Sequence, residues 1–228
     1  MKINKLLLLA SLFIVVGCNN PSLSSSQGET KSNFDIFKEA ITFETNDAYT
    51  GYRLYTYIKS NGKNIYSKSK ILSIDKTNST AELSETIIQI NSDVDDTTDQ
   101  STTSTHLYFT RGSIIKQLED GRYVEIDVEV NFSTGLPKFN PNEDCFTELH
   151  IDLNGNILEM SGTIDPSKAN QLFVTEGLEN ISNATMEADI YDNILEEVNW
   201  AYSVDELEVS QRLVISYDNF EIYPPAVD

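Results

Sequence analysis

Residues 52–62 read YRLYTYIKSNG, and this stretch decides the fold of the chain. Every second side chain from Tyr52 to Ile58 lies on the same face of an extended strand, because successive residues of a strand point to opposite faces. The pair Asn61-Gly62 follows, and this dipeptide is the strongest short signal for a two-residue hairpin turn. The stretch therefore predicts a strand that turns back into an antiparallel partner.

The same alternation recurs along the rest of the chain. Its clearest example follows Asp120-Gly121, where Val124, Ile126, Val128 and Val130 share one face and polar residues occupy the other. Such a pattern is typical of a sheet with one wet face. Further strands are predicted at residues 64–75, 81–91, 105–109, 114–118, through 154–156 to 164, 184–191, 194–202 and 211–222.

Helical spacing is confined to short stretches. Residues 33–43 place apolar side chains at helical intervals behind Asn33, a possible N-cap. Asp165-Pro166 predicts the start of a helix of about a dozen residues, because Asp caps well and Pro suits the first turn. A single helical turn is expected at residues 203–208, and a mobile acidic hairpin loop at 92–104. Together these elements predict an antiparallel α+β domain.

The N-terminus has the three parts of a secretory signal. Lys2 and Lys5 precede an apolar run from Leu6 to Val16, and Gly17-Cys18 follows it. Residues 15–18, Val-Val-Gly-Cys, resemble the lipobox of bacterial lipoproteins, in which the cysteine receives a diacylglyceryl group and becomes the first residue after cleavage. The alternative is an ordinary signal peptide that happens to end in cysteine. Two acyl chains on Cys18 are enough for stable anchoring to a membrane.

These features predict three regions. Residues 1–17 are a cleaved signal peptide, residues 18–32 a lipidated flexible tether rich in Ser and Asn, and residues 33–228 a single α+β domain. The net charge of −20, with 16 basic against 36 acidic residues, excludes a sequence-independent grip on nucleic acid. With Cys18 used for lipid, Cys145 is the only other cysteine, and we interpret it as a small buried residue.

Three parts of this layout resemble the LolA/LppX-like lipoprotein families, including the LprG type. They are the strand-turn-strand run of residues 107–125, the Ser-Gly-Thr-Ile-Asp stretch 161–165 that leads into a helix, and the hairpin 186–202 followed by residues 214–220. The resemblance spans about residues 50 to 223 and rests on the order of elements. It contains no diagnostic motif.

This resemblance implies a strongly curved antiparallel sheet, a half-open barrel with a few helices on its concave side, and an apolar cavity for acyl chains. Members of these families carry lipids or lipid-modified proteins. The alternative is that the apolar face packs against the helices as a solid core. The implied pocket residues are Leu107, Phe109, Val124, Ile126, Val128, Ile190, Leu213 and Ile215.

No arrangement of residues in the sequence indicates catalysis, a metal site or a cofactor. His106 and His150 are the only histidines and are far apart in sequence, which does not fit a local zinc site. The acidic run from Asp93 lacks the Gly and Glu that an EF-hand requires, since Thr98 and Ser104 stand at those positions. No G-x-S-x-G motif or P-loop is present. We therefore expect a non-enzymatic protein.

We expect a monomer held on the extracytoplasmic side of the cell membrane by lipid on Cys18, and two hypotheses follow for its function. In the first, the sheet binds lipid or lipoprotein acyl chains. In the second, the protein has a solid core and contacts a protein or cell-wall partner through its surface, where Tyr55, Tyr57 and Tyr66 could lie together. A third role, as a sensor of envelope stress, has no support from particular residues.

Changing Cys18→Ser removes the thiol that takes the lipid. We expect this variant to leave the membrane fraction while its folded domain stays intact, because no basic patch or second lipid site supports the anchor. Cell fractionation and circular dichroism measure the two effects. Full retention of the variant in the membrane fraction would contradict the assignment of the lipobox.

Overall fold

A computed structural model describes residues 31–42, 49–91, 99–128, 138–173 and 180–227. The predicted signal peptide, Cys18 and the tether up to residue 30 lie outside these ranges, so the anchor stays a prediction. Most of the acidic segment predicted as a loop, residues 92–98, also lies outside them, as does Val130.

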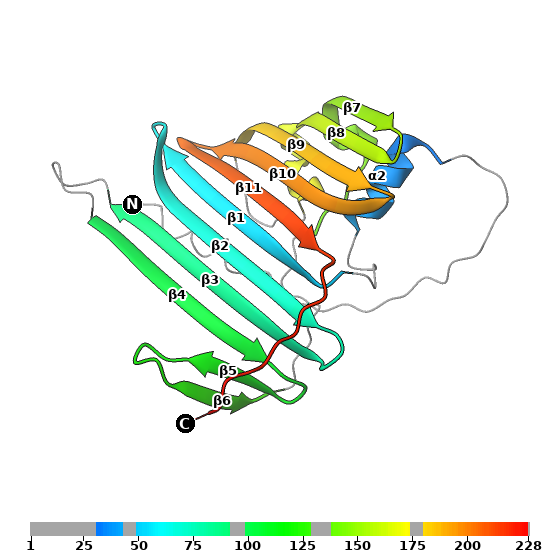
Figure 1. Ribbon diagram of the computed structural model, residues 1–228. Helices are drawn as coiled ribbons and strands as arrows, with labels where there is room; N and C mark the ends of the chain where they lie inside the picture. The colour runs from blue at the N-terminus through cyan, green and yellow to red at the C-terminus, as the bar shows by residue number, and fades with distance from the viewer. Residues whose placement is uncertain (1–30, 43–48, 92–98, 129–137, 174–179, 228) are drawn as a thin grey trace.

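The described chain forms one open antiparallel sheet of eleven strands, in the order β6-β5-β4-β3-β2-β1-β11-β10-β9-β8-β7 (Figure 1). The strands are β1 (Gly51–Ser60), β2 (Lys63–Asp75), β3 (Thr80–Asn91), β4 (Asp99–Phe109), β5 (Ser113–Gln117), β6 (Tyr123–Asp127), β7 (Phe146–Asn154), β8 (Ile157–Ile164), β9 (Ile181–Tyr191), β10 (Ile194–Val204) and β11 (Leu207–Ser216).

Two consecutive meanders meet at the centre of this sheet. Strands β1 to β6 run in chain order to one edge, and β7 to β11 run in order from the other edge back to the middle. The pairing of β1 with β11 joins them, with Gly51 opposite Ser216 and Ser60 opposite Leu207. Among the described strands, the centre of the sheet therefore depends on the pairing whose partners are farthest apart in sequence.

Short turns set the register of the hairpins. Asn61 and Gly62 both have positive φ, 51° and 73°, as a two-residue turn that follows the right-handed twist of strands requires. Asp192 and Asn193 do the same between β9 and β10, at 49° and 63°. Both predicted hairpins are confirmed.

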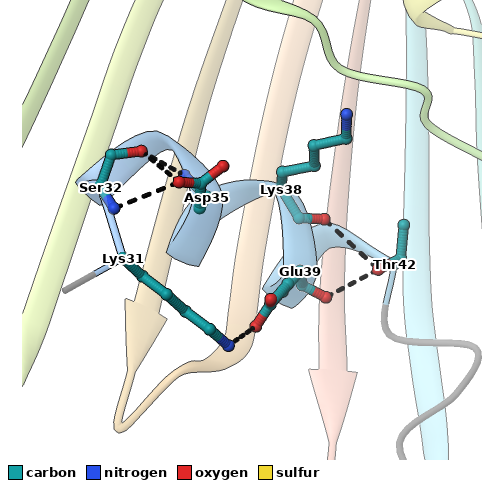
Figure 2. Close-up of polar contacts among 6 residues, drawn as sticks. All are labelled: Lys31, Ser32, Asp35, Lys38, Glu39 and Thr42. Atoms are coloured by element: carbon teal, nitrogen blue, oxygen red, sulfur yellow. Dashed lines mark hydrogen bonds and ion pairs between the residues drawn. The ribbon is translucent and has the colours of Figure 1, made fainter. Parts of the chain in front are cut away.

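The first described helix, α2 (Asn33–Ile41), begins one residue earlier than expected. Its N-cap is Ser32, not Asn33: the Asp35 amide donates to Ser32 Oγ at 3.1 Å, and the Ser32 amide donates to Asp35 Oδ2 at 3.2 Å (Figure 2). This reciprocal pair is a capping box. At the other end the Thr42 hydroxyl donates to the Glu39 carbonyl at 2.8 Å. The apolar side of the helix buries Phe34 and Phe37.

The remaining described helices are short. They are the 3₁₀ turns η2 (Glu143–Cys145) and η3 (Pro166–Lys168) and the helix α3 (Ala169–Leu172). Asp165 caps η3 as predicted, because its side chain accepts a hydrogen bond from the Ser167 amide at 2.9 Å. The described part of the predicted helix is shorter than a dozen residues, and residues 174–179 lie outside the described ranges.

Three sequence predictions are wrong in detail. Residues 99–104 belong to β4 rather than to a loop, because they pair with β3. Residues 203–208 are the end of a hairpin rather than a helical turn: 203 and 204 belong to β10, 207 and 208 to β11, and Asp205, at φ 54°, lies in the two-residue turn between them. The last strand ends at Ser216 and not at residue 222. The described fold is thus mostly antiparallel sheet with a few short helices.

We call the sheet face that packs against α2 the inner face. The strand register places Tyr52, Leu72, Leu213 and Ile215 on it, and all four belong to the main hydrophobic core with Phe34 and Phe37 of α2. The principal contacts of α2 are with β7, β8 and β10, while η3 contacts β9. Figure 1 shows the helix behind this part of the sheet. The described helices therefore cover mainly one end of the inner face.

The last residues of the chain are held on the opposite, outer face by a buried carboxylate. Asp75, at the end of β2, is 1% exposed and accepts hydrogen bonds from the Asn78 amide at 2.9 Å, the Asn78 side chain at 2.7 Å and the Ile222 amide at 3.2 Å. The Thr80 hydroxyl also donates to the Ile222 carbonyl, at 3.3 Å. The hydrogen bonds from Asn78, and then that from Ile222, lower the pKa of Asp75.

A carboxylate with a lowered folded-state pKa stabilises the fold above its unfolded pKa, about 3.9, and loses that contribution as the pH falls through the folded value. We expect Asp75→Asn to lower the urea midpoint at pH 7, because an amide at this position turns a donor toward groups that already donate. The difference from the parent should shrink below about pH 4. Asp152→Asn, at an exposed position of β7, is the matched control. An equal midpoint at pH 7 would contradict the role of Asp75.

Candidate functional site

The inner face carries a row of apolar side chains that reaches from β11 to β4, but their burial falls from one half of the sheet to the other. Met186, Val198 and Leu213, on β9 to β11, are at most 1% exposed. Leu83 and Leu107, on β3 and β4, are only half-buried, although they continue the row that includes Leu72. The half of the sheet farther from α2 therefore presents a partly open apolar surface.

The predicted pocket residues divide along the same gradient. Leu213, Ile215 and Ile190 are buried in the main core. Leu107 and Phe109 are half-buried on β4, and Val124 is half-buried on β6, sharing the inner face through the strand register. The last two, Ile126 and Val128, are 51% and 41% exposed and do not enter the buried part of the face.

A band of polar side chains crosses the middle of the inner face. Thr56 of β1 stands opposite Gln211 of β11 and Lys68 of β2, and it is 4% exposed. The Trp200 indole N–H donates to Gln211 Oε1 at 2.9 Å, and the Gln211 amide donates to Thr56 Oγ1 at 3.1 Å. These bonds link three neighbouring strands and satisfy the buried polar atoms that take part.

The band separates two apolar clusters. On one side lies the main core, which includes Tyr52, Leu72 and Leu213. On the other side Ile58, Tyr66 and Val209 form a smaller buried cluster. An inner face built only to be filled by the protein's own core would not need polar groups between two apolar regions, because burying them costs free energy unless every one is paired.

Two lysines and one glutamate extend the band onto β2 and β3. Lys68 is 8% exposed, and its Nζ lies 2.6 Å from Glu85 Oε2. Lys70, the next residue on the same face, stands directly opposite Glu85, but its ammonium lies 5.8 Å from the centre of the Tyr52 ring. Glu85 therefore pairs with its diagonal neighbour, and Lys70 turns toward the apolar row of Tyr52 and Leu72.

Burial around the polar band shifts the pKa values of the lysine and tyrosine side chains that lie beside it. Burial lowers the pKa of Lys70. The negative charge of Glu85 acts against this shift, and the positive charge of Lys68 adds to it. Burial, followed by the charge of Glu85, raises the pKa of Tyr66 to about 12 and that of Tyr52 still further. Each of these shifts is what desolvation does to a charged form.

The outer face holds the other residues singled out in the sequence. Tyr55 and Tyr57 lie there, but Tyr66 is buried on the inner face, so the predicted group of three tyrosines does not form. The His106 Nε2 lies 2.5 Å from Glu82 Oε1 on strands β4 and β3. His150 lies on β7, toward the opposite edge of the sheet.

The remaining residues with reactive or metal-binding side chains do not form a further site in the described ranges. Cys145 is fully buried in the main core, as the sequence indicated. Among the described residues, no group of three His, Cys, Asp or Glu side chains could hold a metal ion. Within those ranges every helix is too short or too polar to cross a bilayer.

The sequence interpretation missed the residues of the polar band, namely Thr56, Lys68, Lys70, Glu85, Trp200 and Gln211. A signal for two of them was present: Lys68 and Lys70 stand at the same alternating positions as Leu72 and Ile74 in the segment YSKSKILSI. Lysines at the same alternating positions as apolar residues of a strand predict charge on the covered face.

No protein-family model matches this chain, and no curated protein matches it.

Proposed function

We propose that this protein is a membrane-anchored lipoprotein of the bacterial cell envelope that binds acyl chains, without catalysis, on the inner face of its sheet. The observation that carries the proposal is the incomplete burial of Leu83, Leu107 and Phe109. These side chains lie on the same sheet face as the fully buried core of the other half. An acyl chain laid across this half would bury the exposed part of that surface. Each buried CH₂ contributes about 0.8 kcal/mol.

The arrangement of the helices supports the same function. The described helices make their main contacts with β7 to β10, and the sheet remains open, with β6 and β7 at its edges. A large sheet with helices over one end leaves apolar side chains beside a packed core, and apolar side chains are what mainly lines the sites of apolar ligands. The LolA/LppX-like fold that the sequence resembles is part of this proposal.

The alternative, a solid-core interaction protein, has the weaker support. It relied on three tyrosines on one surface, and Tyr66 is buried away from Tyr55 and Tyr57. The two functions differ in whether the protein retains lipid after purification.

The test is to purify the full-length protein in a neutral detergent, extract it with organic solvent and quantify the released acyl lipid by mass spectrometry. We expect lipid in a fixed ratio to the parent protein. Leu107→Glu should reduce that ratio by at least about tenfold, because a carboxylate replaces an apolar contact worth about 2 kcal/mol. Circular dichroism checks that the variant folds.

Leu153→Glu is the matched control. Leu153 lies on β7 and is 51% exposed, so the same change there alters the charge of the protein without touching the inner face of β3 and β4. Its lipid content should equal that of the parent. Absence of lipid from the parent, or equal lipid in the two variants, would contradict the proposed function.

A further inference from the structure

We infer that Lys70, set beside the Lys68–Glu85 pair, receives the carboxylate of a fatty acid whose chain lies on the inner face. The inference rests on the proposed function, because it specifies the head group of the acyl ligand.

The described side chains of the polar band have more positive than negative charge. Lys68 and Lys70 bring two positive charges to the inner face, and Glu85 brings one negative charge that is 2.6 Å from Lys68. Among the residues that the structure describes, no carboxylate lies within ion-pair distance of Lys70. A half-buried ammonium with no anion is costly, and an incoming anion would remove that cost.

The overall charge of the chain makes this local surplus unusual. The protein has 36 acidic and only 16 basic residues, so a lysine without a carboxylate partner is not the result of a shortage of acids. The directly opposite residue on β3 is in fact an acid, Glu85, yet it pairs with Lys68. The geometry leaves the Lys70 ammonium directed along the inner face.

The surroundings of Lys70 define the rest of the ligand. The next row on the same face is Leu72, Leu83 and Leu107, opposite one another on β2, β3 and β4. Two residues along a strand correspond to about 6.8 Å, so an anion at Lys70 would place the first carbons of an attached chain on that row. Half-buried Leu83 and Leu107 provide apolar contacts there. The site therefore fits a molecule with one anionic end and an apolar chain.

A carboxylate fits this position better than a phospholipid head group. The band lies between the main core and the cluster of Ile58, Tyr66 and Val209, so apolar side chains stand on both sides of it. A glycerol phosphate would bring further polar oxygens to these side chains, and each would need a partner. A fatty-acid carboxylate is compact and has one charge, which matches the single charge of the Lys70 ammonium.

The experiment titrates the full-length protein in a neutral detergent with four probes, using native mass spectrometry. Palmitate and hexadecanol share the chain and differ in the anionic end; phosphatidylglycerol and diacylglycerol differ in the same way for a phospholipid. We expect the parent to prefer palmitate over hexadecanol by about tenfold, the size of one charge-assisted hydrogen bond. No comparable preference is expected for phosphatidylglycerol over diacylglycerol.

Lys70→Met should abolish the preference for palmitate while hexadecanol still binds, because methionine keeps an apolar stem without the charge. Lys70→Arg should preserve the preference, and Lys59→Met, at an exposed position of β1, should behave as the parent does. Thermal unfolding should show that Lys70→Met is about as stable as the parent, since the change removes both the desolvation cost of the ammonium and its contact with the Tyr52 ring. If Lys70→Met does not fold, the Arg variant and the parent ratios still decide the question.

The outcomes separate this inference from the proposed function. If no probe binds, both fail. If palmitate and hexadecanol bind equally to the parent, or if Lys70→Met keeps the parent's preference, the acyl site stands and the assignment of Lys70 is overturned. A preference for phosphatidylglycerol without one for palmitate would overturn the assignment of the carboxylate.

Discussion

An open sheet with more apolar surface than the described helices cover is the constraint on which the rest of this structure depends. Eleven strands form one layer, and its centre is the pairing of β1 with β11, which joins the two ends of the domain. The described helices, of which α2 is the longest, pack mainly against β7 to β10. Apolar side chains on β3 and β4 therefore stay half-buried among the described residues, and the proposed acyl ligand would cover them.

The polar band lies at one end of this apolar surface, so the two ends of a bound chain would meet different side chains. Hydrogen bonds connect Trp200, Gln211 and Thr56 across three strands, and the Lys68–Glu85 pair continues the band onto β2 and β3. Networks of this kind stabilise a fold only when each member is satisfied, and the Lys70 ammonium lacks a carboxylate in the described ranges. A ligand with one anionic end would satisfy it, and the site would then distinguish an anionic ligand from a neutral one.

Much of the sheet could be predicted from the sequence because alternation and turn residues are local signals. The Asn61-Gly62 and Asp192-Asn193 turns are examples, since their positive φ values suit few residue types. The start of β4 could not be predicted this way: Thr103 and its neighbours are polar, and they extend because Ile87 and the rest of β3 pair with them. A helical turn was expected at residues 203–208, but the pairing of β10 with β11 imposes a hairpin.

The candidate site was harder to predict than the fold. Lysine in a strand is normally taken as a mark of the wet face, so the alternation of Lys68 and Lys70 with Leu72 was overlooked. The partners of these lysines come from β3, β10 and β11, and only the register of the folded sheet brings them together. The alternation of residues alone therefore identified the apolar face of the sheet. Identifying the charged residues on that face required the pairing of strands in the folded structure.

The most direct measurement is photo-crosslinking of the purified protein with a palmitic acid that carries a diazirine in its chain, followed by peptide mass spectrometry. The account predicts adducts on the inner face of β2 to β4, at residues such as Leu83 and Leu107. Adducts confined to the outer face, at Tyr55 or Tyr57, or an absence of adducts would contradict it.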